Sequence, residues 1–409
     1  MKTIAIDIGT TTIKCALFND GNIVKLFKKE YSLYTDGKSS KQDSESWRKI
    51  IAEGIKSFGD NSDVKGVSIS SQGITIFPVD ENGKPLAFAE TWLDVSAEKE
   101  LEEFCNKFTS EDIYSLTGKE CLPCYSAPKI KRFVDNGVKA YKYLMPSDYI
   151  YFLLCGKYYT DYTMASGTML FDINKKEYKK ELLDFCGISS WQLATPVPMG
   201  TLIGKVNKSG AEEFSLPIGI DVVMGGQDQK MSALYCGVKP NVACVSIGTS
   251  TAICSFEPFS NCAVFAFNEN ALIYEYAISV TGAAIKWLKN ALGFSSYSEM
   301  DACAVKAGSS NGLSFDIDFI SGAIMSNITL DTSRGNIVYA LYEGIAKKIG
   351  GVLPSSVNEI ILYGGGANSQ ILQDIIAKIT NSKITVPTNV ETALSGANKC
   401  IEICVNNKE

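Results

Sequence analysis

Two five-residue segments, residues 8–12 (Ile-Gly-Thr-Thr-Thr) and residues 247–251 (Ile-Gly-Thr-Ser-Thr), are almost identical, and each lies between two short apolar runs. Apolar runs of this length around a Gly-Thr bend are typical of a strand, a tight turn and a second strand. The pattern therefore predicts one hairpin at the start of each half of the chain.

The rest of the chain predicts an alternation of helices and strands. Helical spacing of apolar residues is clearest at residues 44–58, with Trp47 and Ile51 on one face. The predicted helices are residues 44–58, most of 96–154, 172–187, a short helix ending near 234, 283–292, 335–353, 370–380 and 391–405. The predicted strands are residues 64–69, 74–79 and 85–90 (joined by a turn at 80–83), 202–206, 221–224, 263–267, 273–277, 359–363 and 383–386, with 309–331 irregular. This mixture predicts an α/β protein with two domains, residues 1–239 and 240–409, each with a mixed sheet flanked by helices, and a cleft between them.

Composition narrows the classes of function. The 409 residues are 45% hydrophobic, which is enough for two cores, and the net charge is −6. Lys and Arg are scattered, which argues against a nucleic-acid-binding surface. We expect no membrane segment, because no apolar run reaches transmembrane length and the start lacks a signal region. Thirteen cysteines without secretory context predict reduced thiols and a cytoplasmic location; the single CxxC, Cys121 and Cys124, has no second pair for a zinc site.

The chain contains no histidine. Catalytic systems that pair serine or cysteine with histidine are therefore excluded, as are the usual zinc hydrolases. Any general base must be Asp, Glu, Lys, Tyr or Cys.

The two hairpins have the chemistry of a phosphate site. Glycine at the bend lets the backbone approach an anion, and the neighbouring N–H and hydroxyl groups supply donors. Asp7 precedes the first turn and Ser246 the second, an asymmetry that suits one Mg²⁺ beside one of the two walls of a polyphosphate site. Two ordinary Thr-rich hairpins are the alternative.

Two further glycine-rich segments follow predicted strands. Asp228 comes after a strand and two glycines, a position at which α/β proteins display catalytic groups, although a helix-capping role is equally compatible with it. Residues 364–367 form a Gly-Gly-Gly-Ala turn before a helix, which could hold an α-phosphate or simply be a tight turn. A dinucleotide fingerprint and a P-loop are both excluded, because the required glycine and GxxxxGK[ST] pattern are missing.

The order of these parts, hairpin, Asp, hairpin and Gly-rich turn, resembles the sugar kinase, heat-shock chaperone and actin superfamily. In detail the chain is similar to the FGGY carbohydrate kinases, and loosely to their xylulokinase-like members. The motifs that carry the resemblance are Asp7-Ile8-Gly9-Thr10-Thr11, Ser71-Gln72, Trp92-Leu93-Asp94, residues 160–168, residues 225–229, residues 246–250, residues 343–346 and residues 364–369.

The resemblance implies two ribonuclease H-like (actin-like ATPase) domains and phosphorylation of a sugar or polyol, a xylulose-like ketose being favoured, with ATP and Mg²⁺. It implies Asp228 as the general base and Asp7 at the metal. The implied ATP-binding residues are Gly9, Thr10, Thr11, Gly248, Thr249, Ser250, Gly365, Gly366 and Asn368. The implied substrate residues are Gln72, Trp92, Asp94 and Gln229. A homodimer is plausible from the resemblance alone.

Three positions depart from the family pattern. Ile74 stands where relatives often have a polar sugar contact, Ser96 stands where they have an arginine, and residues 314–334 lack the usual Pro-rich segment. These losses predict an unusual substrate. They also leave open a catalytically impaired pseudokinase that binds sugar or ATP as a regulator, and an actin- or chaperone-like ATPase is a further alternative.

Overall fold

The computed structural model describes residues 1–318 and 322–407, which divide into two compact units. Unit 1 contains Met1–Tyr235, Ala263–Leu272 and Glu391–Glu409, and unit 2 contains Cys236–Cys262 and Ile273–Val390. The first segment of unit 1 ends at Tyr235, a few residues before the domain boundary that we expected at residue 239. Two segments that we assigned to the second domain, residues 263–272 and the last helix, belong instead to unit 1.

Unit 1 is built on a six-stranded mixed sheet with the order β14-β15-β6-β1-β2-β3. The first hairpin pairs β1 with β2 antiparallel, whereas β6 runs parallel to β1 and β15 runs parallel to β6. The bounds are β1 Lys2–Ile8, β2 Thr12–Asn19, β3 Asn22–Glu30, β6 Val64–Ser71, β14 Leu202–Lys205 and β15 Asp221–Gln227.

Unit 2 repeats this topology. Five neighbouring strands of its sheet have the order β19-β17-β16-β22-β23, with β17 antiparallel to both β16 and β19, and with β22 and β23 parallel to β16. The bounds are β16 Val242–Ile247, β17 Thr251–Ser255, β19 Leu272–Ile278, β22 Glu359–Tyr363 and β23 Lys383–Thr385. The five strands β3-β2-β1-β6-β15 of unit 1 correspond in order and direction to β19-β17-β16-β22-β23 of unit 2, so the expected duplication of a ribonuclease H-like domain is confirmed.

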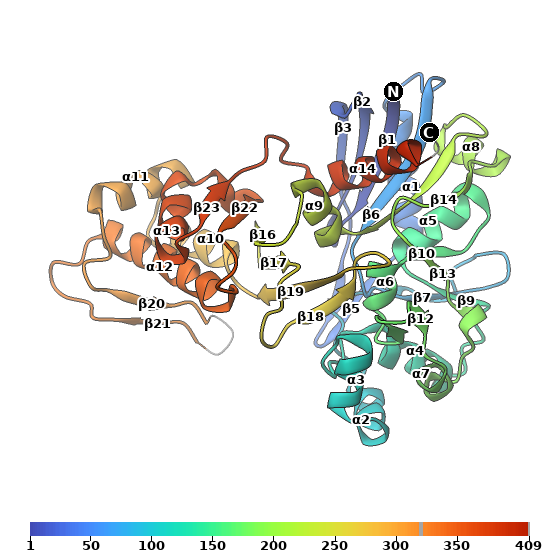
Figure 1. Ribbon diagram of the computed structural model, residues 1–409, viewed down its shortest axis with the longest axis horizontal. Helices are drawn as coiled ribbons and strands as arrows, with labels where there is room; N and C mark the ends of the chain where they lie inside the picture. Colours follow the sequence, from blue (N-terminus) through green and yellow to red (C-terminus); the bar gives the residue numbers. More distant parts are fainter. Residues whose placement is uncertain (319–321, 408–409) are drawn as a thin grey trace. The chain divides into compact units, whose positions relative to one another are not determined.

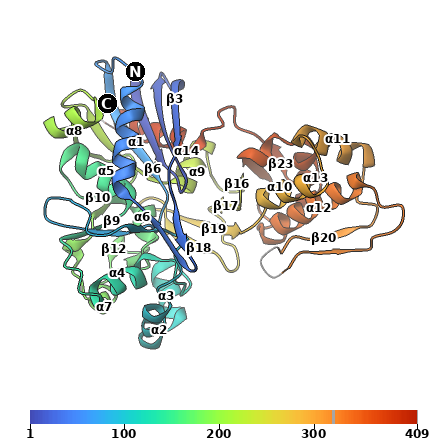
Figure 2. The same cartoon turned by 180° about the vertical axis from the view of Figure 1, so that it is seen from behind.

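Helices cover both faces of the unit 1 sheet. Helix α14 packs against β1, β6 and β15, and α1 and α5 pack against the opposite face. Figure 1 shows α14 in front of the sheet, and Figure 2, from behind, shows α1 and α5. The helices that begin in unit 1 are α1 Ser44–Lys56, α2 Glu98–Lys107, α3 Ser110–Thr117, α4 Ser126–Asp135, α5 Pro146–Cys155, α6 Tyr162–Ser166, α7 Lys180–Cys186, α8 Lys208–Phe214, α9 Asp228–Cys236 and α14 Thr392–Asn406.

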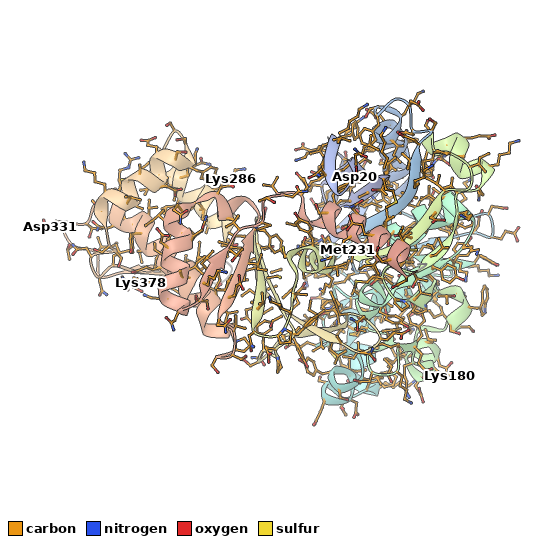
Figure 3. The ribbon with its side chains drawn as sticks, turned by 45° about the horizontal axis from the view of Figure 1, so that its top comes forward. Asp20, Lys180, Met231, Lys286, Asp331 and Lys378 are labelled. Atoms are coloured by element: carbon orange, nitrogen blue, oxygen red, sulfur yellow. The ribbon has the colours of Figure 1, made fainter. Side chains whose placement is uncertain are left out.

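Helices α9 and α14 approach very closely. A Cβ on Gly396 of α14 would lie 2.0 Å from the carbonyl oxygen of Met231 in α9, so only glycine fits there. Met231 is labelled in Figure 3, beside the red ribbon of the final helix. The final helix of the chain therefore packs directly on the helix that begins at Asp228.

The helices of unit 2 are α10 Gly282–Ala291, α11 Tyr297–Ala307, α12 Arg334–Val352 and α13 Gln370–Thr380. Sequence periodicity did not predict α11. The region expected to be irregular, residues 309–331, contains β20 Ser314–Asp316 paired with β21 Ile324–Ser326; residues 319–321 of it lie outside the described part.

The expected hairpin at residues 74–90 is only partly formed. Its turn is present, because Gly83 N–H donates to the carbonyl of Asp80, but only two isolated bridges join its arms. The arms find other partners, since β7 (Phe77–Val79) pairs with β9 (Lys142–Leu144) and β8 (Ala89–Glu90) pairs with β5 (Ser39–Gln42). The helix expected at residues 172–187 begins only at Lys180, after the small pair β11 Phe171–Asp172 and β12 Glu177–Tyr178.

The remaining short strands are β4 Tyr34–Asp36, β10 Tyr159–Asp161, β13 Thr195–Val197 and β18 Ala263–Ala266. All thirteen cysteines are free thiols. Among the described residues, no helix combines the length and apolarity needed to cross a membrane.

Candidate active site

The register of the unit 1 sheet brings three predicted segments to one edge. Ile8 of β1 lies level with Ser71 of β6, and Ser71 lies level with Gln227 of β15. Gln72 donates its backbone N–H to the carbonyl of Ile8 at 2.9 Å. Because these strands are parallel, the Gly9 turn, Gln72 and Asp228 follow their carboxyl ends side by side.

Asp7 lies beneath the first turn and is almost fully buried. Its carboxylate accepts a hydrogen bond from the Ser70 hydroxyl at 2.9 Å and lies 3.9 Å from the ammonium of Lys14. Burial raises the pKa of Asp7 above its ordinary value, and Lys14 and the Ser70 hydroxyl offset only part of this rise. The site therefore has room for additional positive charge.

Lys14 is a site residue that the motifs did not identify. It is the cross-strand partner of Asp7, and it forms a 2.9 Å ion pair with Glu391. Burial alone would lower the pKa of Lys14, but attraction to Asp7, Glu391 and Asp228 outweighs it and raises the pKa. The hairpin register contained the signal, because it places position 14 opposite position 7.

Side chains from three other segments hold the first turn. The Tyr31 hydroxyl donates to the carbonyl of Gly9 at 2.5 Å, and Gln42 Nε2 donates to the carbonyl of Thr10 at 2.6 Å. Trp92 Nε1 donates to Thr10 Oγ1 at 2.8 Å. Gln72 completes this network, since its amide donates to Gln42 Oε1 at 2.8 Å. The turn is thus preorganised.

Of the two candidates in the Trp-Leu-Asp motif, only Trp92 is exposed. Asp94 is fully buried, and its carboxylate accepts hydrogen bonds from Ser40 N–H at 2.8 Å and from the Ser96 hydroxyl at 2.6 Å. These bonds and Arg132 outweigh the effect of burial and lower the pKa of Asp94. Asp94 therefore supports the loop that carries Trp92 and is enclosed away from solvent.

An arginine from another element reaches Ser96, where the resemblance led us to expect an arginine in the local sequence. Arg132 of α4 lies 2.7 Å from the Ser96 hydroxyl, 2.5 Å from the carboxylate of Glu90 and 3.3 Å from that of Asp94. A guanidinium group is thus present at this loop although the local sequence pattern lacks it.

Asp228 is the first residue of α9, where β15 ends. Its carboxylate accepts the N–H of Gln229 at 2.7 Å, and the preceding N–H, of Gln227, donates to Thr163 Oγ1 at 3.0 Å. Asp228 and Gln229 are both partly exposed. The predicted position of Asp228 at the end of a strand is therefore confirmed.

Two buried lysines enclose the ring of Phe265. The ammonium of Lys230 lies 3.3 Å from the ring centroid and that of Lys119 lies 3.6 Å from it. Two like charges this close to one centroid must lie on opposite faces of the ring, which is a cation–π sandwich. Lys230 is two residues after Asp228, so the sandwich anchors the first turn of α9 to the segment of β18.

In unit 2 the second hairpin rests on the start of α10. Gly282 N–H donates to the carbonyl of Gly248 at 2.9 Å, and a Cβ on Gly282 would lie 2.1 Å from that oxygen. Ser246, the counterpart of Asp7, uses its hydroxyl within the hairpin, where it accepts the N–H of Ala252 at 3.1 Å. The asymmetry between the hairpins is thus retained in the structure.

A cavity of about 590 Å³ opens beside this hairpin. It has the size of a small-ligand pocket. Five predicted ATP-binding residues line it: Gly248, Thr249, Gly365, Gly366 and Asn368. Ser250 lies in the same hairpin and is not part of this lining.

Sequence reasoning missed the helical wall of this cavity. Lys286 of α10, labelled in Figure 3, supplies a cation, and Asp301 of α11 accepts a hydrogen bond from the Tyr342 hydroxyl at 2.6 Å. Asp301 was missed because α11 was not predicted, whereas Lys286 and Tyr342 lie in predicted helices and no motif marked them.

Family models match nearly the whole chain. The N-terminal domain of the FGGY family of carbohydrate kinases matches residues 2–235, and the C-terminal domain matches residues 243–400. A xylulose kinase from Staphylococcus xylosus is 28% identical, covering 96% of this chain and 89% of the relative. A gluconokinase from Bacillus licheniformis is 24% identical, covering 96% and 86%.

Solved structures agree in fold. A xylulose kinase from Lactobacillus acidophilus superposes with a TM-score of 0.90 at 20% identity, covering 99% of this chain and 90% of that one. A glycerol kinase from Plasmodium falciparum gives 0.88 at 22% identity, covering 99% and 90%. With both domain models matched end to end, the chain belongs to the FGGY family of carbohydrate kinases.

Proposed function

We propose that this protein transfers the γ-phosphoryl group of ATP to a hydroxyl of a ketose or polyol, with Asp228 as the general base. The observation that carries the proposal is the shared sheet edge in unit 1, where Asp228 stands beside the Gly9 turn and Gln72. A kinase needs a carboxylate, polar groups for the acceptor and a phosphate turn close together, and this edge carries Asp228, Gln72 and the Gly9 turn.

The reaction does not require a general base of unusual pKa. The attacking hydroxyl becomes acidic as its oxygen bonds to phosphorus, so Asp228 needs the correct position more than an unusual proton affinity. Thr163 and the sandwich at Lys230 restrain the turn from which Asp228 projects. These contacts support a fixed carboxylate.

The nucleotide would bind in the unit 2 cavity. Gly248 and Thr249 would donate to the β- and γ-phosphates, and Gly365 and Gly366 would allow the α-phosphate and ribose to approach the backbone. Asn368, Asp301 and Tyr342 line the same cavity and are available to the base. Gly9, Thr10 and Thr11 form the matching Gly-Thr turn of unit 1 and would also donate to the terminal phosphate.

The residues around Asp7 fit a magnesium ion. Mg²⁺ usually takes one or two carboxylates, with phosphates and water completing its shell. Asp7 offers a buried carboxylate whose pKa is raised by that burial, and a bound cation would stabilise its charged form. Among the described residues no group of three or more metal-ligating side chains exists, which suits an ion held mainly by the nucleotide. When bound, the ion would neutralise the phosphates.

A xylulose-like ketose is the favoured acceptor, by likeness to the named xylulose kinases. Gln72, Trp92 and Gln229 would contact it. Asp94 would contribute without contacting the acceptor, by stabilising the loop that carries Trp92.

The test is ATP consumption with Mg²⁺ across pentuloses, hexuloses, polyols and aldonates, for the wild type and for Asp228→Ala and Asp228→Asn. We expect acceptor-dependent consumption that falls by about 100-fold or more in both variants, with ATP affinity unchanged because the nucleotide cavity is in unit 2. ATP binding without stimulation by any acceptor would instead identify a pseudokinase. Acceptor-independent hydrolysis would favour an actin- or chaperone-like ATPase.

A further inference from the structure

A group of thiols in unit 1 has no part in the proposed phosphoryl transfer. Helix α2 carries Cys105, and the segment between α3 and α4 carries the two cysteines of the CxxC motif, Cys121 and Cys124. Figure 1 shows α2 and α4, which pack together, in the lower part of unit 1. Phe104 of α2 belongs to the hydrophobic cluster against which both motif cysteines pack. The fold therefore brings thiols from two segments of the chain together.

The thiol that faces Cys121 belongs to Cys105 of the other segment. The Cys105 and Cys121 thiols hydrogen-bond to each other, which places their sulfur atoms next to one another. Cys124 has a different neighbour, because the ammonium of Lys129 acts on its thiol and donates to its carbonyl at 2.5 Å. A disulfide forms only between cysteines that face each other at short range. The geometry therefore favours a disulfide between Cys105 and Cys121 over one within the motif.

Both members of this thiol pair are open to a small oxidant. Cys105 is exposed and Cys121 is partly exposed, whereas Cys186 of the same hydrophobic cluster is buried. Burial and the adjacent Cys121 thiol raise the pKa of Cys105 to about 11. Cys105 is therefore mostly protonated near neutral pH, which slows its attack on an oxidant. The pair thus stays reduced until the oxidant is abundant.

The two segments that carry the thiol pair also hold the two ends of the loop that contains Trp92. Helix α2 begins at Glu98, directly downstream of this loop. At the upstream end, Lys129 donates to the carbonyl of Thr91 at 2.5 Å, and the same ammonium binds the carbonyl of Cys124. A covalent link between α2 and the CxxC segment would therefore act on both ends of the loop.

Resting on the proposed function, we infer that Cys105 and Cys121 are a peroxide-sensitive pair whose disulfide restrains the Trp92 loop and lowers the efficiency of acceptor phosphorylation. The bond shortens the sulfur–sulfur separation to about 2 Å, which draws α2 and the CxxC segment closer together. The loop between them is then held in a shifted geometry. A displaced positioning residue lowers the rate although the reacting groups are intact.

The oxidation has two steps. The Cys105 thiolate attacks one oxygen of hydrogen peroxide, the O–O bond breaks, and sulfenic acid forms while hydroxide leaves and takes up the thiol proton. The Cys121 thiol then attacks the Cys105 sulfur, so that the disulfide forms and the sulfenic oxygen leaves as water. In total, two thiols lose two electrons and two protons, and one peroxide is reduced to two waters.

The first test treats the reduced protein with hydrogen peroxide, alkylates the remaining thiols and maps disulfides by mass spectrometry. We expect the Cys105–Cys121 disulfide to form first, to be reversed by dithiothreitol, and to be absent from Cys105→Ser and Cys121→Ser. Cys303→Ser, which removes a partly exposed thiol of unit 2, is the control and should leave this disulfide unchanged. A disulfide between Cys121 and Cys124, or no disulfide at all, overturns the inference.

The second test compares oxidised and reduced protein. Oxidation should lower kcat/KM for the acceptor about 10-fold and leave the KM for ATP unchanged, and Cys105→Ser should not respond to peroxide. Hydrogen exchange of the backbone amides of residues 91–96 supplies a readout independent of turnover, and it should slow about 3-fold or more on oxidation.

The two readouts separate this inference from the kinase proposal. A disulfide that changes neither the acceptor kinetics nor the exchange of residues 91–96 overturns the inference while the kinase proposal stands. A disulfide that slows this exchange, in a protein that phosphorylates no acceptor, supports the control of the Trp92 loop and overturns the kinase proposal.

Discussion

Lys14, near the start of the chain, and Glu391, at the start of its last helix, form a 2.9 Å ion pair beside Asp7. Glu391 also pairs with Lys28 at 2.5 Å and is buried. The last helix therefore helps to orient the only cation seen to pair with the proposed metal carboxylate among the described residues.

Glu391→Gln should destabilise the protein. Burial would raise the pKa of Glu391, but Lys14 and Lys28 outweigh it and lower the pKa. A carboxyl with a lowered folded pKa stabilises above its unfolded pKa, and this contribution is lost as the pH falls through the folded value, below about 4.5. We expect a loss of about 1–3 kcal/mol at pH 7 that shrinks as the pH is lowered below about 4.5, measured by urea unfolding. Glu53→Gln, which breaks the exposed pair with Lys29, is the control and should cost less than about 0.5 kcal/mol.

Lys129 should give the protein an unusual alkaline stability profile. It is fully buried in α4 and donates to the carbonyls of Thr91 and Cys124, both at 2.5 Å. Burial lowers its pKa to about 8, against partial compensation from Cys124, Asp94 and Glu90, and Arg132 lowers it further. Between pH 8 and 10.5 the unfolded chain therefore holds more protons at this site, and the free energy of unfolding rises with pH.

Lys129→Met removes this contribution. The difference in unfolding free energy between wild type and variant should shift in favour of the wild type by up to about 3 kcal/mol between pH 7 and pH 10.5. Urea titrations at both pH values measure it. If the unfolding free energies of wild type and variant changed equally with pH, Lys129 would have its ordinary pKa in the folded protein.

Gly365 and Gly366 should respond differently to alanine. A Cβ on Gly366 would lie 2.3 Å from Ile247 Cγ2 in the core strand β16, whereas a Cβ on Gly365 meets nothing within 4 Å. Gly366→Ala should cost about 1–3 kcal/mol of stability through overpacking. Gly365→Ala should keep the wild-type melting temperature and weaken ATP binding about 10-fold, because its methyl group occupies the proposed phosphate wall. Unchanged ATP affinity would remove Gly365 from the site.

Trp92→Phe tests the link to the first phosphate turn. The substitution keeps an aromatic ring but removes the Nε1 donor to Thr10 Oγ1. Trp92 is 40% exposed, so the melting temperature should change little. We expect kcat/KM to fall about 10-fold, the equivalent of one hydrogen bond. Equal kinetics for both proteins would show that the turn is held by Tyr31 and Gln42 alone.

Lys230→Met should lower kcat more than it affects nucleotide binding. Methionine can still pack on Phe265, but the charge next to Asp161 is lost. Burial already raises the pKa of Asp161 to about 6 against the attraction of Lys230, so the variant should raise it further. We expect kcat to fall about 10-fold with unchanged ATP affinity, and Lys230→Arg to restore most of it, since Arg also stacks on aromatic rings. Lys119→Met, on the other face of the ring, is the comparison for a purely structural loss.

Local pattern predicted most elements because the period of apolar residues and the glycines at turns are properties of a few consecutive residues. Both hairpins, the positions of Asp228 and Gly364, and helices such as α12 and α13 lie within a few residues of their expected bounds. Errors occurred where an element depends on distant partners. The arms at residues 74–90 pair with β5 and β9 more than with each other, and α11 buries only Met300 and Ala304, too few to mark one face.

The sequence by itself determined the duplicated domain, the absence of histidine chemistry and the residue types at the phosphate turns. Only the tertiary structure decided which side chains act together. It buried Asp94 beneath the Trp92 loop, supplied Arg132 to the place where Ser96 lacks an arginine, and forced Ile74 into a left-handed turn. Such arrangements depend on packing between segments far apart in the chain, for which no local period exists. The pairing of Lys14 with Glu391, between the first hairpin and the final helix, is the longest of them.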